Sequence, residues 1–278
     1  MLAEPAPRPE VRLMHRNARR LLYLITQLLD IARLEAGSLT LTTVPTDLGR
    51  TVRTTVEAFA PLAQAREVAL GLTTADPPAN AEPLYADPDK LEQILYNLLS
   101  NALKFTSRGG QVVVRVAYTA GQATVAVQDS GIGIAAEELP RVFERFYQTG
   151  KGPARAAGGS GVGLALVREL AALHGGTVAA GSTVGEGSTF RVSLALGTAH
   201  LAGHDMGPAL PAPALAPARW VELAADELRP DELDESAGPA AAAGRPLVLI
   251  VDDSADLRHY LRQCLQADYR LLLAADGP

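Results

Sequence analysis

The stretch Asn97-Leu98-Leu99-Ser100-Asn101-Ala102-Leu103-Lys104-Phe105-Thr106 decides how this chain is interpreted. At about 100° per residue in a helix, Asn97, Asn101 and Lys104 share one narrow face. Another face is apolar, and its residues are Leu91, Ile94, Leu95, Leu98 and Ala102. Because Asn is a poor interior helix former and Lys is costly to bury unpaired, the polar trio predicts a ligand that accepts hydrogen bonds and carries negative charge, such as a metal-bound polyphosphate. Taken alone, the segment is explained equally well as a solvated helix face.

Two glycine-containing clusters further along the chain strengthen the nucleotide hypothesis. The predicted strand Gln122–Gln128 leads into Asp129-Ser130-Gly131-Ile132-Gly133, so a carboxylate stands at a strand end beside two glycines, where a planar ring can approach the backbone. The cluster Gly158-Gly159-Ser160-Gly161-Val162-Gly163 precedes a predicted helix over Leu164–Leu170, and the free N–H groups of a helix start bind phosphate. Each cluster alone is weak evidence, and neither fits a Rossmann βαβ unit.

Taken in this order, these segments resemble the ATP-binding domain of sensor histidine kinases, which is of the GHKL type. The resemblance extends from Leu13 to about Leu196. It rests on five motifs, which are the asparagine box Asn97–Phe105, the first glycine box Asp129–Gly133, the Phe143–Tyr147 box, the second glycine box Gly159–Gly163 and Gly187–Phe190. The fold that it implies is of the α/β class, an α+β two-layer sandwich preceded by a long helix.

The resemblance assigns roles to single residues. It implies that Asn101 binds Mg²⁺ and that Asn97 and Lys104 contact the phosphates of ATP. It also implies that Asp129 accepts a hydrogen bond from the adenine amino group and that Thr189 supports this contact. The other residues that it assigns to ATP binding are Phe105, which would lie near the nucleoside, and Gly131, Gly133, Gly159, Gly161, Gly163 and Leu164. Residues 148–158 resemble the mobile ATP lid, and their small and polar composition agrees with a loop that orders around a ligand.

The segment before this domain is predicted to be a packing helix. From Val11 to Ala36, Leu and Ile recur at helical spacing, and Gly37 ends the run as a C′ glycine. Residues 1–38 resemble the second helix of the dimerisation hairpin, which implies a homodimer in the parent protein. The first helix of that hairpin, with its phospho-accepting histidine, is absent from the sequence, and His15 is interpreted as a surface helix residue. We therefore assign no catalytic residue.

Two more segments follow the predicted ATP-binding domain, which covers residues 39–197. Residues 198–244 are predicted to be a Pro/Ala-rich and acidic linker, in which residues 219–223 are interpreted as unpacked rather than docked. Residues 245–278 resemble the beginning of a doubly wound receiver domain, truncated before its acceptor aspartate. The apolar run Leu247–Val251 ends in Asp252-Asp253, an acid pair that would bind Mg²⁺ weakly, unless it is an ordinary helix N-cap pair.

Composition limits the class of protein. A net charge of −6 over 278 residues provides no basic footprint for nucleic acid, and the single cysteine, Cys264, excludes a disulfide framework. No apolar run approaches the ~18 residues needed to span a bilayer. We therefore expect a cytoplasmic location without membrane contact for these residues, with any tether of the parent protein lying upstream.

The resulting hypothesis is the ATP-binding portion of a hybrid sensor histidine kinase. The family reaction transfers the γ-phosphoryl group of ATP to a histidine and then to a receiver aspartate, with ATP and Mg²⁺ as cofactors and a response regulator or the chain's own receiver as partner. One alternative is a nucleotide-binding remnant without catalysis. Another is a GHKL-fold ATPase, such as a chaperone or topoisomerase, but those enzymes use a glutamate one turn before the metal-binding asparagine, where Asn97 stands here.

Overall fold

A mixed sheet of five strands lies at the centre of residues 19–228, the larger of two units into which the chain divides. The second unit comprises residues 1–18 and 229–278. The computed structural model describes residues 9–119, 121–149, 161–201, 205–206, 217–228, 247–252, 255–266 and 269–274.

The five strands run in the order β2-β4-β5-β7-β6. Their bounds are β2 (Ala69–Thr74), β4 (Gln111–Tyr118), β5 (Gln122–Asp129), β6 (Thr177–Thr183) and β7 (Gly187–Ala195). Only β2 and β4 pair in parallel, and the other three pairs are antiparallel. Side chains alternate along each strand, so that in β4 Val112 and Val114 are buried whereas Gln111 and Arg115 are exposed.

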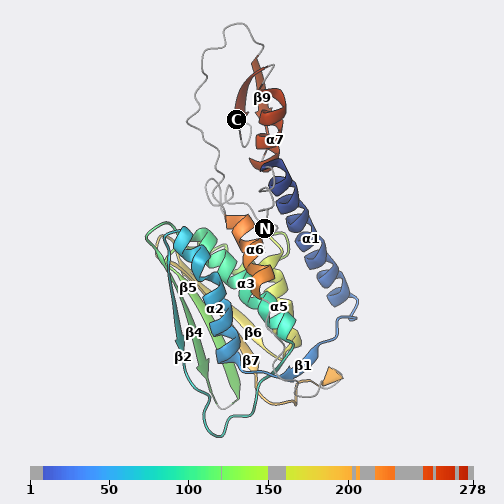
Figure 1. The fold of residues 1–278 in the computed structure, drawn as a ribbon. Helices are drawn as coiled ribbons and strands as arrows, with labels where there is room; N and C mark the ends of the chain where they lie inside the picture. Colours follow the sequence, from blue (N-terminus) through green and yellow to red (C-terminus); the bar gives the residue numbers. More distant parts are fainter. Residues whose placement is uncertain are drawn as a thin grey trace, which may run out of the picture. The chain divides into compact units, whose positions relative to one another are not determined.

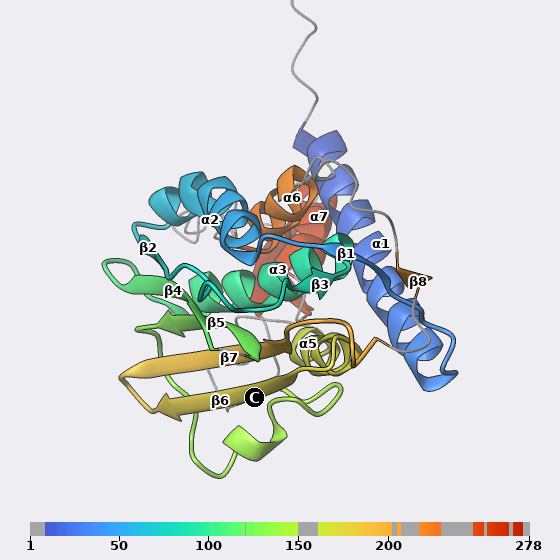
Figure 2. The same cartoon turned by 90° about the horizontal axis from the view of Figure 1, so that it is seen from below.

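Three helices cover one face of this sheet. They are α2 (Leu48–Ala65), α3 (Pro88–Phe105) and α5 (Gly163–Leu173), and they form a layer on one side of the strands (Figures 1 and 2). The predicted two-layer α+β sandwich is therefore confirmed. Helix α3 begins where the Asp87 carboxylate accepts from Lys90 N at 3.2 Å, and Pro88 occupies its first turn. This N-cap fixes the start, and thus the direction, of the helix that carries the asparagine box.

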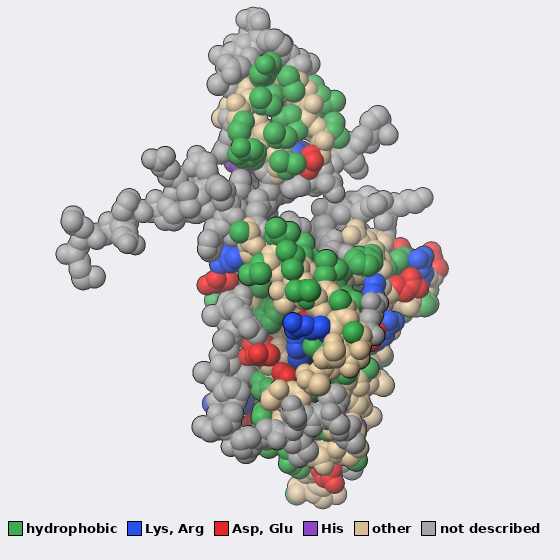
Figure 3. All heavy atoms as spheres, turned by 90° about the vertical axis from the view of Figure 1, so that its right-hand side faces the viewer, with side chains coloured by type: hydrophobic (Ala, Val, Ile, Leu, Met, Phe, Trp, Pro, Cys, Tyr) green, Lys and Arg blue, Asp and Glu red, His purple; other side chains and the backbone are tan. Residues whose placement is uncertain are grey.

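Helix α1 (Pro9–Glu35) precedes the sandwich, and Gly37, with φ of 62°, follows its end as the sequence predicts. Over residues 19–35 one face of α1 is buried and includes Tyr23, Gln27 and Asp30. The opposite face exposes Leu21, Leu22, Ile25, Leu28 and Leu29. Figure 3, which views the side on which α1 lies in Figure 1, shows apolar side chains gathered on that face. The dimerisation role of α1 stays a prediction, and the side chain of His15 lies outside the described residues.

The segment after β7 returns to the sandwich. Strand β8 (Asp205–Met206) pairs in parallel with β1 (Thr42–Pro45), which pairs antiparallel with β3 (Tyr85–Ala86). Helix α6 (Pro217–Leu228) then packs on α2 and α3. The interpretation of residues 219–223 as an unpacked linker segment is therefore wrong. Trp220 and Ala224, one helical turn apart, are 8% and 0% exposed, because together they form an apolar face that α2 and α3 cover.

The second unit contains a strand–helix–strand segment. Strand β9 (Leu247–Val251) is followed by α7 (Ala255–Leu265) and β10 (Arg270–Ala274), which pairs in parallel with β9. Ile250 is buried, whereas Leu249 and Leu272 remain exposed, so the described residues cover only one face of this strand pair. The assignment to a receiver domain stays a prediction. Among the helices that the structure describes, none combines the length and apolarity needed to cross a membrane.

Candidate functional site

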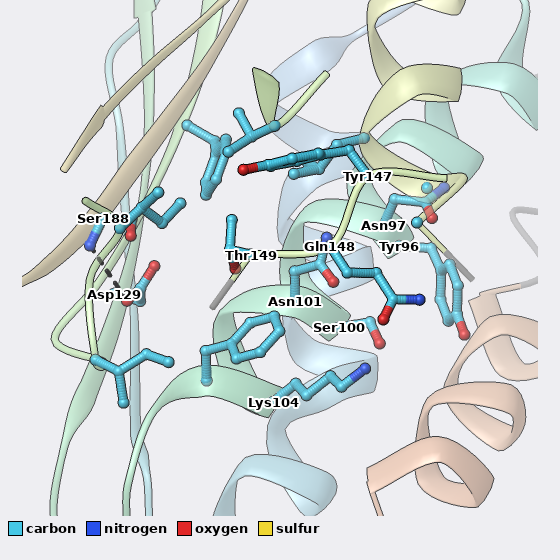
Figure 4. Close-up of a pocket in the computed structure, with 18 of the residues that line it drawn as sticks. Tyr96, Asn97, Ser100, Asn101, Lys104, Asp129, Tyr147, Gln148, Thr149 and Ser188 are labelled. Atoms are coloured by element: carbon cyan, nitrogen blue, oxygen red, sulfur yellow. Dashed lines mark hydrogen bonds between the residues drawn. The ribbon is translucent and has the colours of Figure 1, made fainter. Parts of the chain in front are cut away.

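A cavity of about 150 Å³ lies between α3, the sheet and the segment after the 3₁₀ turn η1 (Leu139–Arg141) (Figure 4). We call the side around Asp129 and Ser188 its sheet end, and the side around Asn97, Asn101 and Lys104 its helix end. Its other described lining residues are Tyr23, Gln27, Tyr96, Ser100, Phe105, Ile132, Gly133, Ile134, Val142, Tyr147, Gln148, Thr149, Gly161, Gly163, Leu164 and Phe190.

The structure brings most of the predicted ATP-binding residues to this one cavity. Those that line it are Asn97, Asn101, Lys104, Phe105, Asp129, Gly133, Gly161, Gly163 and Leu164. Gly159 and residues 150–158 of the predicted lid lie outside the described residues, while Gln148 and Thr149, at the start of that loop, line the cavity. The sequence motifs, scattered along the chain, therefore converge at one place in the fold.

The sheet end is held by main-chain hydrogen bonds. Asp129 Oδ1 accepts from Gly131 N at 2.9 Å and from Ser188 N at 3.3 Å, and the residue is only 6% exposed. Burial raises the pKa of the Asp129 carboxyl above its ordinary value, and the two N–H donors partly oppose this rise. The arrangement orients one carboxylate toward the cavity as an acceptor (Figure 4).

Thr189 does not line the cavity, which corrects its predicted support of Asp129. In the β5–β7 register Asp129 pairs with Ser188, whereas Thr189 pairs with Gln128, whose side chain is exposed on the outer face of the sheet. Because successive strand residues point to opposite faces, the one-residue difference moves the side chain out of the site. Ser188 takes the position that the resemblance had given to Thr189.

Gly131 does not line the cavity, yet its lack of a side chain shapes the sheet end. A Cβ on this residue would stand 2.3 Å from the carbonyl oxygen of Phe105, the last residue of α3. The glycine thus lets the segment after β5 pass close to the end of α3, where Ile132 N donates to the same oxygen at 3.3 Å. The backbone of the first glycine box is therefore fixed against the helix that carries the asparagine box.

The helix end is built from side chains of α3. Asn101 and Lys104 are half-buried, and Lys104 Nζ lies 5.4 Å from the centroid of the Phe105 ring. Among the described residues that line the cavity, Lys104 is the single lysine or arginine. In Figure 4 the side chains of Asn101 and Lys104 approach the cavity from the α3 side, opposite Asp129. One cation and several amides suit an anion whose remaining charge a metal ion neutralises.

Two residues of α1 belong to the helix end, and neither is among the site residues predicted from the sequence. Tyr23 OH donates to Asn97 Oδ1 at 3.2 Å, and Gln27 Nε2 donates to the same oxygen at 3.3 Å. Asn97 Nδ2 in turn donates to the Gln93 carbonyl oxygen at 2.8 Å. A signal was present in the sequence, because Tyr23, Gln27 and Asp30 follow one another at helical spacing between leucines and form a polar stripe.

His174 is a capping and packing residue. It is 1% exposed at the end of α5, its Nδ1 lies 2.7 Å from the Leu170 carbonyl oxygen, and its Nε2 accepts from Asp87 N at 3.1 Å. Its ring therefore joins the end of α5 to the N-cap of α3. It does not line the cavity.

The described residues fit Mg²⁺ only as a companion of a ligand. They contain no group of three or more His, Cys, Asp or Glu side chains that would hold a metal ion. Mg²⁺ commonly takes one or two protein oxygens and completes its shell with water and substrate phosphates, so the Asn101 amide oxygen suits that arrangement. In the second unit Asp252 is half-buried, and Asp253 lies outside the described residues.

Comparison with known proteins identifies the domain. Residues 86–198 match the family model described as histidine kinase-, DNA gyrase B- and HSP90-like ATPase. Among curated relatives, the sensor histidine kinase TmoS of Ectopseudomonas mendocina is 33% identical over 268 residues, which are 95% of this chain and 27% of TmoS. The circadian input-output histidine kinase CikA of Synechococcus elongatus is 40% identical over 187 residues, 66% of this chain and 24% of CikA. The chain thus spans about a quarter of the length of these relatives.

Solved structures of histidine kinases share the fold. Full-length ShkA, crystallised in complex with AMPPNP, matches with a TM-score of 0.59 at 24% identity, covering 98% of this chain and 63% of ShkA. The Acinetobacter baumannii histidine kinase AdeS matches with a TM-score of 0.56 at 20% identity, covering 69% of this chain and 87% of AdeS. At these identities the likeness concerns the fold alone.

Proposed function

Because this chain belongs to the histidine kinase family through the ATP-binding domain at residues 86–198, we propose that its cavity binds Mg-ATP as the phosphoryl donor of a sensor histidine kinase. The adenine ring lies at the sheet end, where the Asp129 carboxylate accepts from its amino group. The polyphosphate lies at the helix end against Asn97 and Lys104, and Asn101 holds Mg²⁺ together with phosphate oxygens and water.

One observation carries this proposal: a buried carboxylate and a cluster of amides with one lysine face each other across a single cavity. A carboxylate recognises an exocyclic amino group, and amide N–H groups with an ammonium recognise phosphate. The carboxylate and the amides come from segments that are far apart in the sequence. Their convergence on one cavity therefore argues against a polar patch formed by chance. The α5 start, at Gly163, adds main-chain N–H groups beside the helix end.

Phosphoryl transfer depends mainly on positioning of the reactants and on charge neutralisation. Asn97, Asn101, Lys104 and the start of α5 supply both, and the attacking nucleophile is the acceptor side chain. The acceptor is a histidine on the dimerisation hairpin of the parent protein, and a receiver aspartate takes the group onward. The long helix α1 contributes the exposed apolar face through which two copies associate. These steps are part of the proposal for a whole histidine kinase, because the chain spans about a quarter of the length of its curated relatives.

A binding measurement tests the nucleotide assignment. We expect Asn101→Ala to abolish Mg²⁺-dependent ATP binding in calorimetry while leaving adenosine binding and thermal unfolding unchanged, because the Asn101 side chain is half-buried and lines the cavity. Asn80→Ala, at an exposed asparagine that does not line the cavity, is the matched control. Unchanged Mg-ATP affinity in a folded Asn101→Ala variant contradicts the site.

A second measurement separates the kinase from an ATPase or a remnant. We expect the chain to transfer label from radiolabelled ATP to a separately supplied dimerisation domain, and to release little phosphate in its absence, because Asn97 provides no general base for water. Steady-state phosphate release that disappears in Asn97→Ala supports an ATPase instead. Tight Mg-ATP binding without either reaction supports the remnant.

A further inference from the structure

We propose that Tyr23 and Gln27 of helix α1 are positioning residues for the polyphosphate, because they hold the Asn97 amide with its remaining N–H available to an anion. The proposal rests on the proposed function and extends it to residues outside the ATP-binding motifs. It makes α1 part of the nucleotide site, and through Trp220 it also involves the helix α6 that follows the sandwich.

The orientation of the Asn97 amide follows from its three partners. The Gln93 carbonyl oxygen is an acceptor only, so the Asn97 group that faces it at 2.8 Å must be the nitrogen. The oxygen then faces α1, where Tyr23 OH and Gln27 Nε2 donate to it. Two donors occupy both lone pairs of the Oδ1 atom, whereas the nitrogen has used one of its two protons.

This pattern suits a site for phosphate. An amide oxygen beside a polyphosphate repels it, while an amide N–H attracts it. By saturating the Asn97 oxygen, Tyr23 and Gln27 leave the N–H as the unused group of this side chain, and they prevent a rotation that would turn the oxygen toward the ligand. Asn97 is 6% exposed, so water competes little with these bonds.

Gln27 carries a second sign of a ligand. The residue is 1% exposed and lines the cavity, and its Nε2 donates to both Tyr23 OH and Asn97 Oδ1. Its Oε1 is buried and has no hydrogen-bond partner within the described part of the chain. A buried acceptor left unpaired is costly. A water molecule bound to the Mg²⁺ of the nucleotide complex would supply the donor that this oxygen lacks.

The Tyr23 side chain is held in place by aromatic rings from two other helices. Its ring lies edge-on to Tyr96 of α3 at 5.3 Å and to Trp220 of α6 at 5.8 Å between centroids. Trp220 Nε1 donates to Glu92 Oε2 at 3.1 Å, and Glu92 is 3% exposed. Such contacts restrict the ring to one orientation and so aim the Tyr23 hydroxyl at Asn97.

One turn further along α1, an ion pair fixes the rotation of the helix. Asp30 Oδ2 accepts from Lys90 Nζ at 3.1 Å and from Gln93 Nε2 at 3.2 Å, and the Asp30 side chain is 6% exposed. Both donors belong to α3, so the polar stripe of α1 contacts that helix at Asp30 as well as at Tyr23 and Gln27. The two bonds keep Tyr23 and Gln27 level with Asn97.

The test compares Mg-ATP with adenosine in calorimetry on the intact chain. Tyr23→Phe removes the hydroxyl and keeps the ring, and Gln27→Met removes the amide at similar size. We expect each to weaken Mg-ATP binding roughly threefold to tenfold, the range of one hydrogen bond, and to leave adenosine binding unchanged. Tyr85→Phe, at a half-buried tyrosine that does not line the cavity, should change neither affinity.

Each outcome decides. Selective loss of Mg-ATP affinity at an unchanged unfolding temperature supports the positioning role, and Trp220→Phe, which keeps an aromatic ring behind Tyr23, should retain most of the affinity. Unchanged or tighter Mg-ATP binding in both Tyr23→Phe and Gln27→Met overturns the inference while the proposed function stands. An equal loss of affinity for Mg-ATP and for adenosine overturns the inference, because it assigns the two residues a structural role only. If the wild-type chain binds neither ligand, the proposed function fails and the inference with it.

Discussion

The two ends of the cavity are built in different ways. At the sheet end, Asp129 is fixed by main-chain N–H groups of Gly131 and Ser188, which the sheet register places beside it. At the helix end, Asn97 is fixed by side chains of α1, whose positions depend on how that helix docks on α3. Backbone hydrogen bonds within a sheet are lost only when the sheet opens, whereas a docked helix can shift as a unit. Adenine recognition is therefore expected to be constant, and polyphosphate recognition to depend on α1 and α6.

The largest expected effect comes from removing the support of the helix end. Trp220→Ala should lower the free energy of unfolding by about 3–5 kcal/mol, because it empties a buried site between α1, α3 and α6. Urea unfolding measures this change. Trp220→Phe keeps the ring and loses the N–H donor to Glu92, so it should cost about 1 kcal/mol. Equal stabilities of the two variants would show that α6 does not support the site.

A smaller effect is expected at the sheet end. Gly131→Ala places a Cβ 2.3 Å from the Phe105 carbonyl oxygen, and such overpacking should destabilise the fold by about 1–3 kcal/mol and weaken adenosine binding. Gly181→Ala is the matched control, because no heavy atom lies within 4 Å of the added carbon and Gly181 has no positive φ. Thermal unfolding and calorimetry give the two readouts. If adenosine and Mg-ATP weaken by different factors in Gly131→Ala, the two ends are not independent.

The smallest effect concerns pH. Burial raises the pKa of Asp129 in the folded chain, so the folded state holds the proton to higher pH than the unfolded chain does. Wild-type stability contributed by this group is present at low pH and is lost as the pH rises through the raised pKa. Asp129→Asn cannot titrate, so its stability relative to wild type should increase over that pH interval. A series of urea unfolding curves measures the difference, and a difference that stays constant or falls with pH contradicts the assignment.

The local patterns in the sequence predicted the elements that carry the site. Helix α3 is recognisable because its leucines and its asparagines each recur at helical spacing. Asp129 is recognisable because it ends an alternating strand beside two glycines. Confusing Thr189 with Ser188 shows the limit of this approach, since the register of β5 against β7 is a long-range property and one residue changes the face.

The contributions of α1 and α6 required the folded structure. Periodicity identifies the buried face of a helix but not the surface that covers it. The polar stripe of Tyr23 and Gln27 was therefore recognisable in the sequence, but its contact with Asn97 was not. In residues 198–244 the Pro/Ala-rich and acidic composition obscured a turn of helix with Trp220 and Ala224 on one side. Trp220 was the residue in this segment that indicated a docked helix, and the overall composition of the segment did not reveal it.

The small sheet of β1, β3 and β8 has a consequence for how the domain is connected to other parts of a longer chain. The chain enters the sandwich along β1, and β8, the first strand after the five-stranded sheet, is the hydrogen-bonded neighbour of β1 before α6 packs on α2 and α3. Domains whose entry and exit points lie close together tolerate insertion into a host sequence, because the host needs to accommodate only a narrow gap. We therefore expect that modules beyond α1 and α6 can differ without rearranging the five-stranded sheet, whereas α1 and α6 themselves must be kept because they contact α3 beside the nucleotide site.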